Sequence, residues 1–142
     1  EGILSGVVIY GPQSRPTFAD NEVCDNRESG IFVFAGAQPR VADNLCRRNH
    51  HFGIAVRDPG SHPELIRNRC EENMLSGMLL FHHAKALLVD NQCRGNQHWG
   101  IVLTPDCMPT PDAATLERSN VLLPNPRGPV IVMDTPLAEI GR

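Results

Sequence analysis

Apolar and polar positions recur along the chain in the same order every 23 or 24 residues. Each repeat holds three short apolar pieces separated by turn residues, and none shows the 3.6-residue period of an amphipathic helix. The longest piece follows a recurrent glycine and has apolar residues at the first and third positions after it, which predicts a short strand with one buried face. These paired positions are Val7 and Ile9, Ile31 and Val33, Ile54 and Val56, Met78 and Leu80, and Ile101 and Leu103.

Asparagine occupies two further columns of the repeat and occurs nowhere else in the chain. The first column is Asn21, Asn44, Asn68, Asn91 and Asn120, and the second is Asn26, Asn49, Asn73, Asn96 and Asn125. An asparagine side chain both donates and accepts hydrogen bonds, and its backbone tolerates the left-handed conformation of a tight corner. We therefore predict that the asparagines stand at corners and form hydrogen-bonded ladders along a stack.

A column of glycines keeps the same spacing and stands directly ahead of the predicted strands. Its members are Gly6, Gly30, Gly53, Gly77 and Gly100. We expect these glycines to serve either a corner with positive φ or a place that has no room for a Cβ atom.

Two repeat architectures have about this length. A leucine-rich repeat needs several leucines per unit and a helical or 3₁₀ return segment, whereas here the return is as strand-like as the rest. A parallel β-helix uses three strands and three turns per coil and stacks its coils about 4.8 Å apart. The sequence therefore predicts one all-β domain over 1–142, a single-stranded parallel β-helix solenoid. Five regular coils of 23 or 24 residues span 6–103, a loop insertion occupies 104–115, and a degenerate sixth coil with a terminal cap spans 116–142.

The repeat pattern PxLxxN-x-C-x-x-N-x-x-x-GIxV resembles the right-handed parallel β-helix repeat families. These include the pectate-lyase-like superfamily, carbohydrate-binding and sugar-hydrolysis repeat domains, periplasmic NosD-type proteins and F-box-associated β-helices. The resemblance covers Gly6 to Leu103 and, in weaker form, Leu116 to Met133, and it implies a right-handed solenoid. It implies no single activity, because such repeats occur in lyases, epimerases, copper-site maturation proteins and ubiquitin-ligase substrate receptors.

Composition narrows the range of partners. The chain has 142 residues, of which 41% are hydrophobic and 20% charged, as in an ordinary globular domain. Its formal net charge of -3 argues against a nucleic acid or an acidic membrane as the partner. No apolar run approaches the roughly 20 residues of a membrane helix, and the start, EGILSGVVIY, lacks the features of a signal peptide. The compartment stays open.

The outward positions of the glycine-led strands are unusually apolar. They are Val8, Phe32, Ala55, Leu79 and Val102 in one column, and Tyr10, Phe34, Arg57, Phe81 and Thr104 in the other. A contiguous apolar patch marks a partner surface, a sugar-stacking groove or a surface that another segment covers. We predict a binding face, for a protein partner or a glycan, formed by Tyr10, Phe32, Phe34, Leu79 and Phe81. Pairing of copies through this face or through the open solenoid ends is an alternative, as is a covering segment of the same chain.

Polar residues follow three consecutive strands and form the candidate catalytic set Arg57, Asp58, His82 and Asp106, with His83 beside them. Coil stacking brings such residues within about 5 to 10 Å of one another. In pectate-lyase-like enzymes the matching face is the substrate groove, where a base, an acid and a cation act on a uronic-acid polymer. The same turns could hold a metal through histidine and aspartate. The chain lacks both the epimerase-like Asp-Pro-His-Asp motif and the tight aspartate cluster of calcium-binding pectate lyases, which argues against the enzyme hypothesis. We expect no metal and no cofactor.

The five cysteines do not form a closed disulfide framework, because their number is odd. Cys46, Cys70 and Cys93 share a column with Val23 and Leu122, which indicates a small buried side chain. Stacked one coil apart, their Cβ atoms would be about 4.8 Å from one another, beyond the favoured disulfide range. We expect free, reduced thiols, and Cys107 in the loop as the more reactive one.

Three functions are compatible with these observations. The first is a binding or scaffold module that presents the apolar face and the 104–115 loop to a partner. The second is a polysaccharide lyase or epimerase that uses the candidate catalytic set on an acidic polysaccharide. The third is a structural stretch of a larger protein whose active part lies elsewhere.

Overall fold

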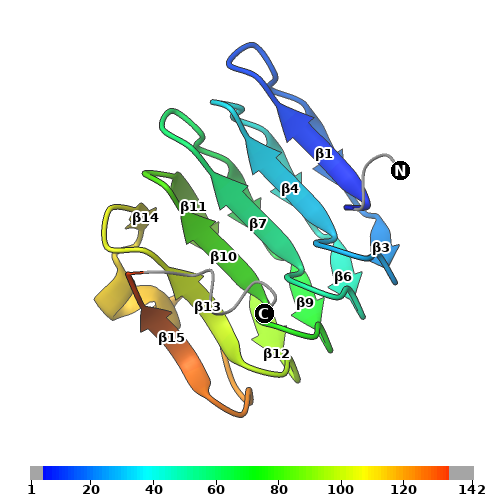
Figure 1. The fold of residues 1–142 in the computed structure, drawn as a ribbon, viewed down its shortest axis with the longest axis vertical. Helices are drawn as coiled ribbons and strands as arrows, with labels where there is room; N and C mark the ends of the chain where they lie inside the picture. Colours follow the sequence, from blue (N-terminus) through cyan, green and yellow to red (C-terminus); the bar gives the residue numbers. More distant parts are fainter. Residues whose placement is uncertain (1–4, 135–142) are drawn as a thin grey trace.

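A computed structural model describes residues 5–134 as a stack of coils built from three parallel sheets (Figure 1). Sheet A contains β1 (Val7–Tyr10), β4 (Ile31–Phe34), β7 (Ile54–Arg57), β10 (Met78–Phe81), β13 (Trp99–Leu103) and β15 (Gly128–Val132). Sheet B contains β2 (Thr17–Ala19), β5 (Arg40–Ala42), β8 (Glu64–Ile66), β11 (Lys85–Val89) and β14 (Met108–Thr110). Sheet C contains β3 (Glu22–Cys24), β6 (Leu45–Arg47), β9 (Arg69–Glu71) and β12 (Gln92–Arg94).

Each strand pairs in parallel with the equivalent strand of the next coil. Ile31, for example, is in register with Val7 of the preceding coil and Ile54 of the following one. The columns of the sequence are therefore the vertical registers of the stack. The described part contains five coils and the first strand of a sixth, which confirms the predicted all-β solenoid.

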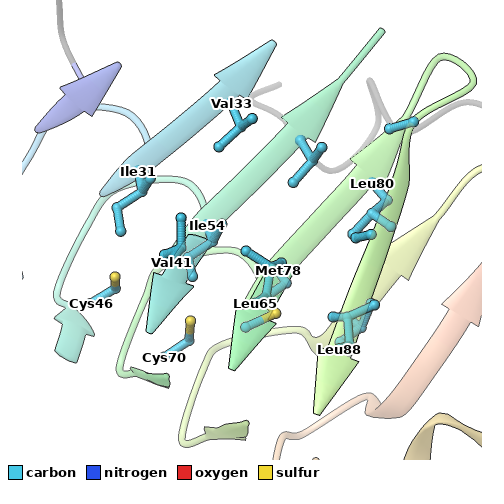
Figure 2. Packing of buried hydrophobic residues seen from close by; sticks show 14 of the residues in the cluster. Ile31, Val33, Val41, Cys46, Ile54, Leu65, Cys70, Met78, Leu80 and Leu88 are labelled. Atoms are coloured by element: carbon cyan, nitrogen blue, oxygen red, sulfur yellow. The ribbon is translucent and has the colours of Figure 1, made fainter. Parts of the chain in front are cut away.

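The core lies inside the coils and is formed by one face of each sheet (Figure 2). The first and third residues after each recurrent glycine point inward, and in the central coils they are fully buried, as with Ile54 and Val56. Val41 and Leu65 of sheet B and Cys46 of sheet C meet them from the other two sides. Burial of one such aliphatic side chain stabilises the fold by about 1.5 to 3 kcal/mol.

The asparagines form the two predicted ladders. In the second ladder, the Asn49 amide nitrogen Nδ2 donates to Oδ1 of Asn73 at 3.0 Å, and the Asn49 backbone N–H donates to the same oxygen at 3.1 Å. Nδ2 also donates to the carbonyl of Val23 at 3.3 Å. Because each inner amide uses both its donors and its acceptor, the buried corners leave no polar group of the ladder unpaired.

We had predicted that the asparagine itself adopts the left-handed conformation at the corner. In the structure, the residue before the asparagine adopts it. The residues with positive φ that precede an asparagine are Asp20, Asp25, Asp43, Arg48, Arg67, Glu72, Asp90 and Gly95. The asparagine side chain must turn inward to reach the next coil. The preceding residue makes the bend and directs its own side chain away from the core, which explains why this position is mostly charged.

The glycine column is required by close approach and not by positive φ. A Cβ atom on Gly53 would lie 2.7 Å from Sγ of Cys70 and 2.9 Å from the carbonyl oxygen of Gly77. Gly77 meets Cys93 and the Gly100 carbonyl in the same way. Neighbouring coils therefore touch backbone to backbone at this corner.

The predicted loop at 104–115 is shorter than expected. Met108–Thr110 forms β14, which pairs with β11 and continues sheet B. The surplus residues instead form a 3₁₀ helix, η1 (Ala113–Arg118), which buries Leu116 in the core. Prolines at 109 and 111 concealed this strand in the sequence, since proline is tolerated only on the edge of a sheet.

The last coil is irregular, as predicted. Asn120 and Asn125 complete the two ladders, and Val121 makes a single bridge to Gln92 before the chain enters β15. The predicted terminal cap at 135–142 lies outside the described residues. Within 5–134, no helix has the length and apolar character needed to cross a bilayer.

Candidate functional site

The outward face of sheet A carries the predicted binding residues, and their accessibility varies. Tyr10 is 61% exposed, whereas Phe32, Phe34 and Phe81 are partly buried. Leu79 does not fit the prediction of a projecting contact residue, because its side chain is only 1% exposed and lies beneath its neighbours.

Leu79 is buried in a second apolar cluster on the outside of sheet A. This cluster contains Phe52, Ala55, Leu79 and Val102, with Phe32, Leu75, Phe81, Trp99, Ile131 and Met133 packed against it. Phe52 and Trp99 each stand directly before a glycine of the close-packed column. A bulky residue at the position before the glycine packs into the outer cluster, and the sequence prediction missed this because it considered only the positions after the glycine.

An aromatic stack with an arginine at its end lies at the carboxyl ends of the first strands of sheet A. The rings of Tyr10 and Phe34 are stacked with centroids 5.4 Å apart, and Phe32 lies 4.8 Å from Phe34. The Arg57 guanidinium lies 5.1 Å from the Phe34 centroid and 5.2 Å from that of Phe32. Tyr10 and Arg57 belong to the coils on either side of Phe34, so both faces of that ring are occupied.

A groove of about 180 Å³ runs over the same face. It is lined by Ser5, Glu28, Ser29, Phe32, His51, Phe52, Ala55, Arg57, Leu79 and Phe81. Glu28 and His51 precede the strands, while Arg57 and Phe81 end them, so the groove has a charged group at each end of an apolar floor. Burial lowers the pKa of His51, and this effect outweighs the Glu28 carboxylate, which acts to raise it. The lowered pKa favours the neutral imidazole near pH 7.

The lining by His51 and Glu28 is a second feature that the sequence did not reveal. Their column also contains Leu75 and reads as an exposed turn. The structure instead places His51, partly buried, in the lining of the groove. The large apolar neighbour at Phe52 is the signal that could have indicated an enclosed corner.

Three of the four candidate catalytic residues meet at the turn from sheet A to sheet B. Asp58 Oδ1 lies 3.0 Å from His82 Nδ1 and 3.2 Å from Arg57 Nε, and Asp58 Oδ2 accepts the backbone N–H of Ala35 at 2.9 Å. Asp106 is not part of this group. It accepts a hydrogen bond from the Thr104 hydroxyl and lies 3.5 Å from Nε2 of His83.

Electrostatics around Asp58 stabilises its charged form. Burial raises the pKa of this carboxyl, but the hydrogen bonds from His82 and Ala35 together with the Arg57 charge outweigh burial, and the pKa lies below its usual 3.8. The pKa of Asp106 is lowered too, mainly by the Thr104 hydroxyl. A base that removes a sugar proton works best with a pKa near the working pH. The lowered pKa values of Asp58 and Asp106 therefore suit carboxylates that stabilise the turns better than a catalytic base.

The chain matches the family model described as a right handed beta helix region over residues 3–120. The chain belongs to the right-handed β-helix family. Neither the curated proteins nor the solved structures contain a significant match. Membership of the β-helix family thus accounts for the fold, the ladders and the handedness, and leaves the chemistry of the groove to be argued from its residues.

Within this β-helix, the cysteines are all free thiols. Cys46, Cys70 and Cys93 stack in the core. The pKa of Cys70 is raised well above 9.0 by hydrogen bonds with Cys46 and Cys93 and by burial. Cys107 is partly exposed, and burial raises the pKa of its thiol as well. Within residues 5–134, no group of three or more histidine, cysteine, aspartate or glutamate side chains is placed to hold a metal ion.

Proposed function

We propose that this β-helix domain is a binding module that engages a protein partner through the outer face of sheet A. The observation that carries the proposal is the enclosure of Phe34 between Tyr10 and Arg57. A sugar ring packs flat on an open aromatic face, whereas the ring of Phe34 is covered and the stack offers the Tyr10 phenol at one end and the Arg57 guanidinium at the other. Tyrosine and arginine gathered at one place with a phenylalanine are typical of the centre of protein interfaces.

The groove beside this stack supports the same function. Its volume of about 180 Å³ suits one large apolar side chain of a partner, and its floor of Ala55, Phe52 and Leu79 is apolar. Such an anchor in a preformed pocket contributes much of the energy of many interfaces. The stacked coils hold the pocket on strands, so little conformational entropy is lost when it is filled.

Site-specific photo-crosslinking tests this function in the full-length protein. A benzoylphenylalanine probe replaces Tyr10 in one variant and Met108 of sheet B in the control, because the two side chains are 61% and 64% exposed. We expect a discrete protein adduct from the probe at position 10 that is absent from position 108 and is lost on Arg57→Ala. Identical adducts at both positions would indicate a structural stretch without a binding face.

A glycan-binding screen distinguishes a protein partner from a carbohydrate. Screening the wild type and Phe34→Ser against immobilised glycans should give no binding that depends on Phe34, because the faces of that ring are occupied. Glycan binding that is lost in Phe34→Ser, without a protein adduct, would replace the proposed protein partner by a carbohydrate.

A polysaccharide lyase or epimerase is the second candidate, and the meeting of Arg57, Asp58 and His82 is the observation in its favour. Both oxygens of Asp58 already accept hydrogen bonds, and its lowered pKa weakens it as a base. A lyase releases unsaturated uronides that absorb near-ultraviolet light. Such a product from an acidic polysaccharide, lost on Asp58→Asn, would establish the enzyme instead.

A further inference from the structure

We infer that the groove binds an extended partner segment in which one bulky apolar side chain is flanked by two side chains of opposite charge. The acidic side chain faces Arg57 and the basic one faces Glu28. This inference rests on the proposed protein-binding function and adds the chemistry of the partner to it.

Arg57 is prepared to receive a carboxylate. Its guanidinium is stacked on Phe32 and Phe34, and its Nε lies 3.2 Å from Asp58 Oδ1. These contacts fix the side chain while the two terminal amino groups form no hydrogen bond within residues 5–134. A planar guanidinium with its terminal nitrogens available binds a carboxylate through two parallel hydrogen bonds.

Glu28 supplies the opposite charge at the other end of the groove. Its side chain lines the groove and takes part in no ion pair among the described residues. The neighbouring His51 does not neutralise it, because burial lowers the pKa of that imidazole. A lysine or arginine of the partner would neutralise this carboxylate, and a second acid would be repelled.

An extended chain can lie along the strands between the two ends. Glu28 stands three residues before β4 and Arg57 is the last residue of β7, and each of these strands has four residues and a length of about 13 Å. In an extended segment, alternate side chains point to the same side, so the first, third and fifth residues face the groove and span a similar length. The matching pattern is basic, any, apolar, any, acidic, read in either chain direction.

Labelled peptides test the pattern by fluorescence anisotropy with the full chain. The probes are Lys-Thr-Phe-Thr-Glu, its reverse, and the like-charged versions with two lysines or two glutamates. We expect at least one of the two bipolar peptides to bind about tenfold more tightly than either like-charged peptide, the effect of one favourable charge-assisted pair. Equal affinity for all four peptides would overturn the inference.

Two charge reversals provide a sharper test, because each variant is expected to prefer a different like-charged peptide. Arg57→Glu should shift the preference to the dilysine peptide, and Glu28→Lys should shift it to the diglutamate peptide. Arg40→Glu, on the exposed surface of sheet B, is the matched control and should keep the bipolar preference. Circular dichroism verifies the fold of each variant.

The outcomes separate this inference from the proposed function. If the crosslinked adduct at position 10 forms but neither reversal changes peptide preference, the charge pattern is wrong and the binding face stands. If neither the adduct nor a peptide complex forms, both are wrong.

Discussion

A Cβ atom on Gly53 would lie 2.7 Å from the sulfur of Cys70, closer than two such atoms can approach without displacement. The glycine is thus fixed by its neighbour in the next coil and not by its own backbone angles. This relationship recurs along the column and makes the corner sensitive to a single methyl group.

Gly53→Ala should therefore lower the free energy of unfolding by at least about 2 kcal/mol, because the Gly77 carbonyl blocks a shift away from Cys70. Urea unfolding followed by circular dichroism measures the change. Gly95→Asn is the control, since Gly95 has φ +72°, which asparagine tolerates, and an added Cβ would meet its nearest atoms, in Glu72, only at 4.0 Å. Its effect should stay within about 0.5 kcal/mol.

Asn73→Ala should lower the free energy of unfolding by about 3 kcal/mol or more. The change removes the acceptor of two Asn49 donors and leaves the Asn96 and Cys46 oxygens without the amide that Asn73 gave them. Asn21→Ala tests the exposed end of the other ladder and should cost less than about 1 kcal/mol. Equal losses in urea unfolding would contradict the ladder as a source of stability.

The cysteines should react in two classes with a thiol reagent such as dithiobis-nitrobenzoate. Cys46, Cys70 and Cys93 are fully buried and should react only after unfolding. Cys24 and Cys107 should react slowly at neutral pH and faster as pH rises toward and above 9, because the pKa of each is raised, by a hydrogen bond with Asp25 and by burial respectively. Fast reaction of Cys107 at pH 7 would contradict this ordering.

Asp58 should contribute to an acid-dependent loss of stability. Its pKa in the folded protein is below the roughly 3.9 of an unfolded chain, so its stabilisation is complete above about pH 4 and is lost as pH falls through the lowered value. Asp58→Asn should therefore reduce the fall in the free energy of unfolding between about pH 6 and about pH 3. The same fall in both proteins would show that Asp58 does not act through its charge.

Ser14→Ala provides the control for this pH series. The Ser14 hydroxyl donates to the Tyr10 carbonyl at 2.6 Å in the same row of turns, and the change removes no titrating group. Its effect on the free energy of unfolding should be the same at both pH values.

The sequence predicted the register of the fold because each column repeats a physical requirement of stacking. Asn49 and Gly53 could be placed in ladders and at corners from their spacing alone, and the structure confirms both. The left-handed residue was assigned one position late, because asparagine itself tolerates that conformation and the charged residue at Arg48 gives no such indication.

The candidate site was less predictable, because its accessibility depends on contacts outside the strand pattern. Phe52 lies at a corner and Trp99 is the first residue of β13, and nothing in a period of two residues shows that both pack in one cluster with Leu79. The closeness of Asp58 and His82 followed from stacking, whereas the separation of Asp106 depends on the local turn that pairs it with Thr104.

The asparagine ladders have a direction. Every inner amide donates from its own coil to the oxygen of the following coil, so the amide dipoles point the same way along the solenoid axis. At the last coil, the Nδ2 groups of Asn120 and Asn125 donate instead to carbonyls of their own coil, at Leu116 and Leu122. A coil designed to extend the stack ahead of Asn21 could donate directly to the Oδ1 atoms of Asn21 and Asn26. A coil added after Asn125 would first have to break the hydrogen bonds to the Leu116 and Leu122 carbonyls.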